Sequence, residues 1–201
     1  MIRTIIFDLG KVIIPFDFKR GYQKLAPRIG CAPEEIPARL LEHDLPNRLE
    51  SGAIEPRAFV AEVCRVLNFE CNYEEFCEMW SSIFLSDTLI PEKFVQALGR
   101  NYRLVLLSNT NAIHFEMVSA RYPILRHFDE YVLSHVVGAM KPSPLIYEAA
   151  VKASRVKPEE CFFTDDIPAY VEGARAYGID AVQFQNYEQI QGELRARGVT
   201  W

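Results

Sequence analysis

The sequence lacks an apolar stretch long enough to cross a bilayer, which takes about 18 residues or more. Positive charge is also scarce, because 22 Lys and Arg stand against 27 Asp and Glu, for a net charge of −5. Proteins that bind nucleic acid usually carry a basic face. We therefore expect no membrane association and no nucleic-acid partner. The N-terminus leads directly into an apolar segment, without the pattern of a secretory signal, so we expect a cytoplasmic protein.

Cysteine and histidine are few and show no metal-binding spacing. The five cysteines include no Cys-x-x-Cys pair, which argues against a zinc site and against a disulfide framework. The four histidines are each interpreted as surface or helix-capping residues. They are His43, His114, His127 and His135. This composition favours oxygen ligands for any metal ion.

The chain alternates strand-like and helix-like patterns over most of its 201 residues. Short apolar runs predict strands at 2–8, 103–108, 131–134, 161–165 and 181–184. Helical spacing follows at about 92–100, 111–121, 144–156, 168–177 and 187–197. Alternation of this kind is typical of an α/β fold with a parallel sheet and helices on both faces.

One long segment breaks the alternation and contains only helical patterns. The expected helices cover about 18–28, 34–43, 55–68 and 73–84, with prolines and Gly52 marking the turns between them. An insert that follows the first strand emerges at the carboxyl edge of the sheet and would cover it. We therefore expect a core domain of residues 1–15 and 88–201, with an all-helical cap domain of residues 16–87.

Asp8 stands at the end of the first apolar run, in the crevice where open α/β sheets bind their ligands. A carboxylate oxygen can attack phosphorus and divide hydrolysis into two easier steps through an aspartyl-phosphate. Taken by itself, an Asp in this place is better explained as a simple turn residue, so the interpretation depends on the later motifs.

Two further motifs fit chemistry at a phosphate. Ser108 and Asn109 follow the second core strand, where a hydroxyl and backbone N–H groups can bind phosphoryl oxygens. The alternative is that these residues only cap the next helix. Lys141, followed by Pro142, is a suitable counterion for phosphate, although such a dipeptide is usually a solvated loop.

The tandem Asp165-Asp166 ends another apolar strand. Adjacent carboxylates repel each other, and Mg²⁺ is a hard ion that prefers oxygen ligands. Such an ion would also offset the repulsion between a carboxylate nucleophile and a phosphate. A helix cap explains one of the two acids but leaves the other without a role.

In this order the motifs resemble those of the haloacid dehalogenase (HAD) superfamily, over essentially the whole chain. The stretches that carry the resemblance are 7–12, 16–18, 107–111, 165–166 and 172–174. Within the superfamily the chain is similar to small bacterial phosphatases of the α-D-glucose-1-phosphate type, which have a helical C1-type cap. The resemblance implies a Rossmann-like core, Mg²⁺ as cofactor and hydrolysis of a small phosphorylated metabolite, a sugar phosphate. We expect a monomer or a weak homodimer.

The resemblance also implies a role for each motif. Asp8 would be the nucleophile, Ser108 and Asn109 would bind phosphate, and Lys141 would balance the charge. The implied metal ligands are Asp8, the backbone carbonyl of Gly10, and Asp166, with Asp165 beside them or holding a metal-bound water.

The sequence departs from the superfamily pattern at two positions. Gly10 replaces a second Asp that acts as general acid and base, a function typically worth about 10²–10⁴-fold. The glucose-1-phosphate branch shares this Gly, so loss of activity does not follow. Lys11 is a candidate substitute donor if burial lowers its pKa, and a solvated lysine is the favoured alternative. Tyr170 stands where related sequences often have Asn.

Two alternatives remain open from the sequence. A 2-haloacid dehalogenase-type hydrolase attacks carbon and needs no Mg²⁺, a reaction that the Asp165-Asp166 pair argues against. A catalytically weak protein that binds a phosphorylated metabolite or a partner is consistent with the two altered positions. The residues expected to select the substrate are polar side chains of the cap, namely Asp17, Arg20, Asn47, Arg48 and Glu50.

Overall fold

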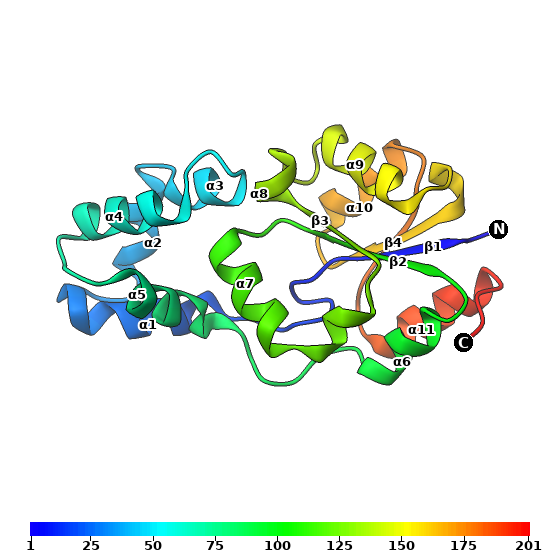
Figure 1. Ribbon diagram of the computed structural model, residues 1–201, viewed down its shortest axis with the longest axis horizontal. Helices are drawn as coiled ribbons and strands as arrows, with labels where there is room; N and C mark the ends of the chain where they lie inside the picture. Colours follow the sequence, from blue (N-terminus) through cyan, green and yellow to red (C-terminus); the bar gives the residue numbers. More distant parts are fainter.

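The computed structural model describes residues 1–201 and contains a parallel sheet of five strands in the order β3-β2-β1-β4-β5 (Figure 1). The strands are β1 (Thr4–Phe7), β2 (Arg103–Ser108), β3 (Glu130–Leu133), β4 (Cys161–Asp165) and β5 (Asp180–Gln183). All neighbouring strands pair in parallel. The predicted α/β class is confirmed.

Helices cover both faces of the sheet, as predicted. They are α6 (Glu92–Leu98), α7 (Ala112–Arg121), α8 (Ser134–Val137), α9 (Pro144–Ser154), α10 (Pro168–Ala176) and α11 (Tyr187–Ala196). Ile5 and Phe7 of β1 belong to the apolar cluster that includes α6, α7 and α11. Ile6, between them, belongs to the cluster that includes α9 and α10. Because successive side chains point to opposite faces, a strand buried on both sides is a continuous apolar run.

The segment between β1 and α6 is helical and has its own apolar cluster, which Ile113 of α7 also joins. Its helices are α1 (Phe18–Ile29), α2 (Glu35–Leu41), α3 (Leu45–Glu50), α4 (Pro56–Leu67) and α5 (Tyr73–Trp80), followed by the 3-10 turn η1 (Ser81–Ile83). Figure 1 shows this group at one end of the molecule, beyond the carboxyl ends of the strands, and both chain termini at the other end.

Three local predictions were wrong. Helix α3 was not predicted because Pro46 was interpreted as a turn, whereas Pro46 lies in the first turn of that helix, where its missing N–H costs nothing. The helix predicted to reach residue 84 ends at Trp80 and continues as η1. Ser134 begins the short helix α8 instead of ending β3.

The chain leaves the sheet after β1 and returns to it before α6 along two segments that are bonded to each other. The N–H of Asp17 donates to the carbonyl of Ile83 at 2.9 Å, and the N–H of Leu85 donates to that of Pro15 at 3.0 Å. These two hydrogen bonds join the entry and exit of the helical segment.

No helix is both long and apolar enough to span a bilayer.

Candidate active site

The acidic motifs meet because their strands are neighbours. Asp8 directly follows β1, and its N–H donates to the carbonyl of Thr164 in β4 at 3.0 Å. Asp165 is the last residue of β4, and Asp166 follows it. One carboxylate oxygen from each acid lies within 4.8 Å of the other two. This donor set, hard oxygens on three converging acids, fits a divalent cation such as Mg²⁺.

Lys141 brings a positive charge into the same cluster. Its Nζ lies 2.6 Å from Oδ1 of Asp8, 2.5 Å from Oδ2 of Asp165 and 3.2 Å from the carbonyl oxygen of Leu107. Only 4% of Lys141 is exposed, so the charge is held by the two carboxylates rather than by water. The lysine motif is therefore part of a buried charge cluster and not a solvated loop.

Asn109 fixes the backbone that carries this lysine. Its Oδ1 accepts a hydrogen bond from the N–H of Lys141 at 2.8 Å, and its Nδ2 donates to the carbonyl of Lys141 at 3.1 Å. Nδ2 also lies 3.3 Å from the hydroxyl oxygen of Tyr170, whose ring centroid is 5.1 Å from the Lys141 ammonium. Tyr170, a departure from the superfamily pattern, thus lies against the lysine and the residue that holds it.

The cluster carries more negative than positive charge. Burial raises the pKa of Asp8, with Asp165 adding to the effect and Lys141 opposing it. Burial and the neighbouring Asp165 likewise raise the pKa of Asp166. Burial opposes the charge on Lys141, but attraction to Asp8 and Asp165 prevails and its pKa is raised. Three acids with one ammonium favour a further cation among them.

Ser108 ends β2, is 2% exposed and lines the same cavity as Asp8. The next helix is capped by Asn111, whose Oδ1 accepts from the N–H of His114 at 3.0 Å. Capping of α7 therefore does not occupy Ser108, which remains available on the cavity that holds Asp8.

The cavity that contains these residues has a volume of about 250 Å³. Its floor comes from the carboxyl ends of the strands and the loops after them. Its other wall comes from the helical segment and the linkers that join it to the sheet. The residues of that wall are Phe16, Phe18, Glu50, Ile83 and Phe84.

Of the five polar residues expected to select the substrate, the structure places only Glu50 on this cavity. Asp17 instead caps α1 by accepting from the N–H of Lys19 at 3.0 Å. Arg20 donates to the carbonyl of Ser82. Asn47 and Arg48 do not line the cavity.

Gly10 lines the cavity beside Asp8, and the ring of Phe16 packs against it. A β-carbon at position 10 would lie 2.6 Å from Cε1 of Phe16, closer than real contacts allow. No side chain fits here unless the ring moves. The position at which the superfamily places its general acid is therefore filled by an aromatic ring.

His114 was predicted to be a surface or capping residue, and that prediction is wrong. Its side chain is buried and lines the cavity. Its ring stacks on Trp80 with centroids 5.9 Å apart, and burial lowers the pKa of His114 to about 4. The ring of Phe84 packs edge-on against the same imidazole, with centroids 5.2 Å apart. A neutral imidazole between Trp80 and Phe84 could not be inferred from one isolated His in the sequence.

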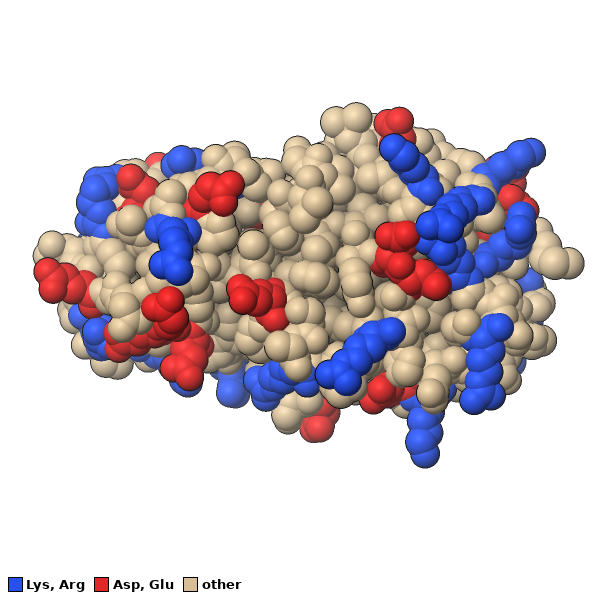
Figure 2. All heavy atoms as spheres, viewed as in Figure 1, with Lys and Arg blue, Asp and Glu red and all other residues tan.

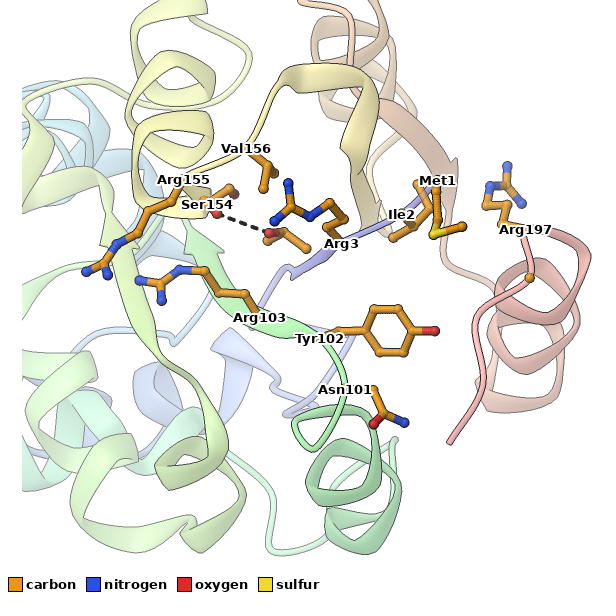
Figure 3. Close-up of a pocket in the computed structure, with 12 residues that line it drawn as sticks. Met1, Ile2, Arg3, Asn101, Tyr102, Arg103, Ser154, Arg155, Val156 and Arg197 are labelled. Carbon is orange, nitrogen blue, oxygen red and sulfur yellow. Dashed lines mark hydrogen bonds between the residues drawn. The ribbon is translucent and has the colours of Figure 1, made fainter.

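A larger, open cavity of about 720 Å³ lies at the opposite edge of the sheet, beside the starts of β1 and β2 (Figure 3). Arginines line it, and basic side chains gather at this end of the face drawn in Figure 2. Arg3 is paired with Glu160, Arg103 with Glu130, and Arg197 with Asp180. Arg155 shares Glu130 with Arg103, so each of these guanidinium groups has an acidic partner. None of the predicted site residues lies there.

The order of the strands reverses between β1 and β4, which is where Asp8 and Asp165 meet. Ligands of open α/β sheets bind at such switch points. The fold and the three acids at this switch point define a class of protein: a doubly wound α/β enzyme whose active site is built on carboxylates. The family model described as haloacid dehalogenase-like hydrolase matches residues 2–178, and the chain belongs to that family.

Characterised and solved relatives match nearly the whole chain. A D-ribitol-5-phosphate phosphatase from Bacteroides thetaiotaomicron is 27% identical in sequence. The alignment covers 96% of this chain and 97% of the relative. A HAD family enzyme from the same organism, solved with magnesium and inorganic phosphate, superposes with a TM-score of 0.82 at 25% identity, covering 92% of this chain and 96% of its own. A HAD-like hydrolase from Porphyromonas gingivalis gives 0.83 at 26% identity and covers both chains fully.

The predicted superfamily and the predicted enzyme class, a HAD-type phosphatase, are confirmed at this level. The predicted cofactor, Mg²⁺, is the ion present in the Bacteroides complex. The narrower likeness to α-D-glucose-1-phosphate phosphatases is not confirmed.

Proposed function

We propose that the protein is a Mg²⁺-dependent phosphomonoester hydrolase that acts on a small phosphorylated sugar or sugar alcohol through an aspartyl-phosphate on Asp8. The observation that carries the proposal is the position of Lys141, whose ammonium lies between the carboxylates of Asp8 and Asp165 in a buried cavity. The relative that is a D-ribitol-5-phosphate phosphatase supports this substrate class.

The residues that would hold Mg²⁺ are Asp8, Asp165 and Asp166, whose carboxylate oxygens converge, together with the backbone carbonyl of Gly10. When bound, the ion would neutralise part of the charge that accumulates when a carboxylate meets a phosphate dianion. Two carboxylates packed against Asp8 without a second cation would cost stability, which disfavours a dehalogenase that needs no metal.

The protein's own groups account for the remaining steps. A carboxylate oxygen of Asp8 forms a bond to phosphorus while the bond to the leaving oxygen breaks. Lys141 holds the Asp8 carboxylate in place and offsets its charge, and Asn109 holds Lys141. The hydroxyl of Ser108 donates to a phosphoryl oxygen. Water then attacks the aspartyl-phosphate, releasing phosphate and restoring Asp8.

We propose further that residues 16–87 act as a cap over a core made of residues 1–15 and 88–201. Support comes from the cavity wall, which is shared between the sheet loops and the helical segment. A volume of about 250 Å³ suits a metabolite rather than a polymer. Opening of the cap would then be needed for substrate and product to exchange.

A panel of phosphorylated metabolites tests the proposal. Phosphate release should require Mg²⁺, stop on addition of EDTA and be lost in Asp8→Asn. The exposed Asp87→Asn serves as the matched control and should retain activity.

A weakly catalytic binding protein is the second candidate, favoured by the ring of Phe16 at the place of the missing acid. Metal-dependent binding of a metabolite, with no turnover of any phosphomonoester, would support that candidate and contradict the hydrolase.

A further inference from the structure

The reaction needs a proton for the leaving oxygen, and position 10 cannot supply it. Gly10 has no side chain, and the Phe16 ring occupies the space that one would need. A hydrolase with this centre therefore has to take the proton from elsewhere in the cavity. Besides Glu50, the nitrogen groups on this cavity that can carry a proton are those of Lys141, Lys11 and His114.

The other proton carriers of the core are poorly suited. Lys141 is bound between two carboxylates. Lys11 is exposed, with its Nζ 5.3 Å from the centroid of the Phe16 ring. The ring nitrogens of His114 are engaged with the carbonyl of Trp80 and the amide of Asn111, and burial keeps the pKa of that imidazole at about 4.

Glu50 is the acid that the helical segment contributes to the cavity holding Asp8. It also borders an adjoining cavity of about 150 Å³ that lies largely among the helices. Its carboxyl group makes no hydrogen bond or ion pair within the protein, and burial is the one cause of its pKa shift. The carboxyl group thus lies at the boundary between the reaction centre and the space available to the rest of a substrate.

The backbone of Glu50 is fixed to the core. Glu50 ends α3, which contacts α8 (Figure 1). Its carbonyl oxygen lies 2.5 Å from the hydroxyl of Ser134, the first residue of α8. The same hydroxyl accepts from the N–H of Thr110, two residues after Ser108. One serine therefore joins the end of α3 to the loop expected to bind phosphate.

The surroundings of Glu50 favour a neutral carboxyl group. Burial raises the pKa of Glu50 from 4.5 to about 7. The phenols that face it are Tyr22 from α1 and Tyr170 from α10. The other charged or titratable groups on its cavity are the three carboxylates of the centre, Lys11, Lys141 and His114. A carboxyl group that titrates near neutrality is well matched to both donating and accepting a proton.

We propose that Glu50 is the general acid and base of this enzyme, in place of the side chain that Gly10 lacks; the inference rests on the proposed phosphatase function. As the bond from phosphorus to the leaving oxygen breaks, the Glu50 carboxyl gives its proton to that oxygen and becomes a carboxylate. The carboxylate then takes a proton from the water that attacks the aspartyl-phosphate. The new phosphorus–oxygen bond releases Asp8 and inorganic phosphate, and Glu50 is again protonated.

The test compares the wild type with Glu50→Gln on two substrates in the presence of Mg²⁺. Ribitol 5-phosphate has an alkoxide leaving group that needs the proton, whereas p-nitrophenyl phosphate has a phenolate that does not. We expect kcat/KM for the alkyl ester to fall by about 10²–10⁴-fold and that for the aryl ester to fall far less. The variant should also lose the alkaline limb of the alkyl-ester pH profile and show a burst of p-nitrophenol, because hydrolysis of the aspartyl-phosphate also needs the base.

Glu42→Gln, on the exposed surface of the same segment, is the matched control and should behave as the wild type. Thermal unfolding shows whether Glu50→Gln is folded, and Glu50→Asp should keep the alkaline limb at reduced rate. Equal losses on both esters, a change confined to KM, or full activity of Glu50→Gln would overturn the proposal. A wild type that hydrolyses neither ester with Mg²⁺ would overturn the phosphatase function itself.

Discussion

The ammonium of Lys141 lies 2.6 Å from a carboxylate oxygen of Asp8, and both side chains are almost completely shielded from water. Little water reaches either group, so the ion pair replaces hydration for the Asp8 carboxylate. Lys141 has the same relationship with Asp165 on the next strand. The lysine thus joins two buried carboxylates from neighbouring strands at the switch point of the sheet.

Replacing this lysine by an apolar side chain should destabilise the fold. Lys141→Met leaves the buried carboxylates without their partner, and breaking a buried ion pair costs about 3–5 kcal/mol. Urea denaturation at neutral pH should show that loss, and added Mg²⁺ should recover part of it. An unchanged unfolding free energy with and without Mg²⁺ would mean that the charge cluster is not held as described. Lys157→Met, an exposed lysine outside the cavity, is the control.

An acid introduced at position 10 should not increase catalysis while Phe16 is present. Gly10→Asp places its β-carbon into the Phe16 ring, and overpacking of this kind typically costs about 1–3 kcal/mol. We expect lower stability and no gain in turnover of alkyl phosphates. In the double variant Gly10→Asp/Phe16→Ala the acid has room. Its loss of unfolding free energy should therefore be smaller than the sum of the losses in the two single variants.

Urea denaturation of the four proteins (wild type, both single variants and the double variant) measures this coupling. A Gly10→Asp variant that is as stable as the wild type and faster on alkyl phosphates would show that the ring does not block the position.

Glu50 should make stability depend on pH in a defined direction. Because burial raises the pKa of Glu50 from 4.5 to about 7, the folded state binds more protons than the unfolded state between these values. Stability therefore falls as pH rises through that range, by about 1–3 kcal/mol for this group. The pKa values of Asp8 and Asp166 are also raised, so these groups contribute a pH dependence of the same sign. Comparison of the wild type with Glu50→Gln isolates the contribution of Glu50.

The variant should show a smaller loss of unfolding free energy between pH 4.5 and 7 than the wild type. If the two pH profiles of unfolding run parallel, the carboxyl group of Glu50 is not held in the buried state on which the proton-transfer proposal depends.

The sheet and its acidic edge could be predicted because local sequence encodes them. Each strand is buried on both faces, so it is a short continuous apolar run, and parallel pairing brings the strand ends together. Asp8 and Asp165 therefore become neighbours without any knowledge of side-chain packing. The same logic placed Ser108 at that edge.

The remaining features depend on contacts that no local pattern records. Phe16 reaches Gly10 only because the chain folds back after β1, and His114 is buried only because Trp80 of the helical segment covers it. Glu50 was one of five polar candidates with equal standing in the sequence. What separates Glu50 from the other four is the end of α3, where its carbonyl accepts a hydrogen bond from Ser134.

The most direct test of the account is to trap the covalent intermediate. Wild-type protein mixed with a phosphorylated substrate and Mg²⁺ is quenched in acid within the first turnovers, and the phosphorylated peptide is mapped by mass spectrometry. We predict a phosphoryl group on Asp8, absent in Asp8→Asn and absent when EDTA replaces Mg²⁺. Turnover that proceeds with no phosphoryl group on Asp8, or that survives in Asp8→Asn, would contradict the account.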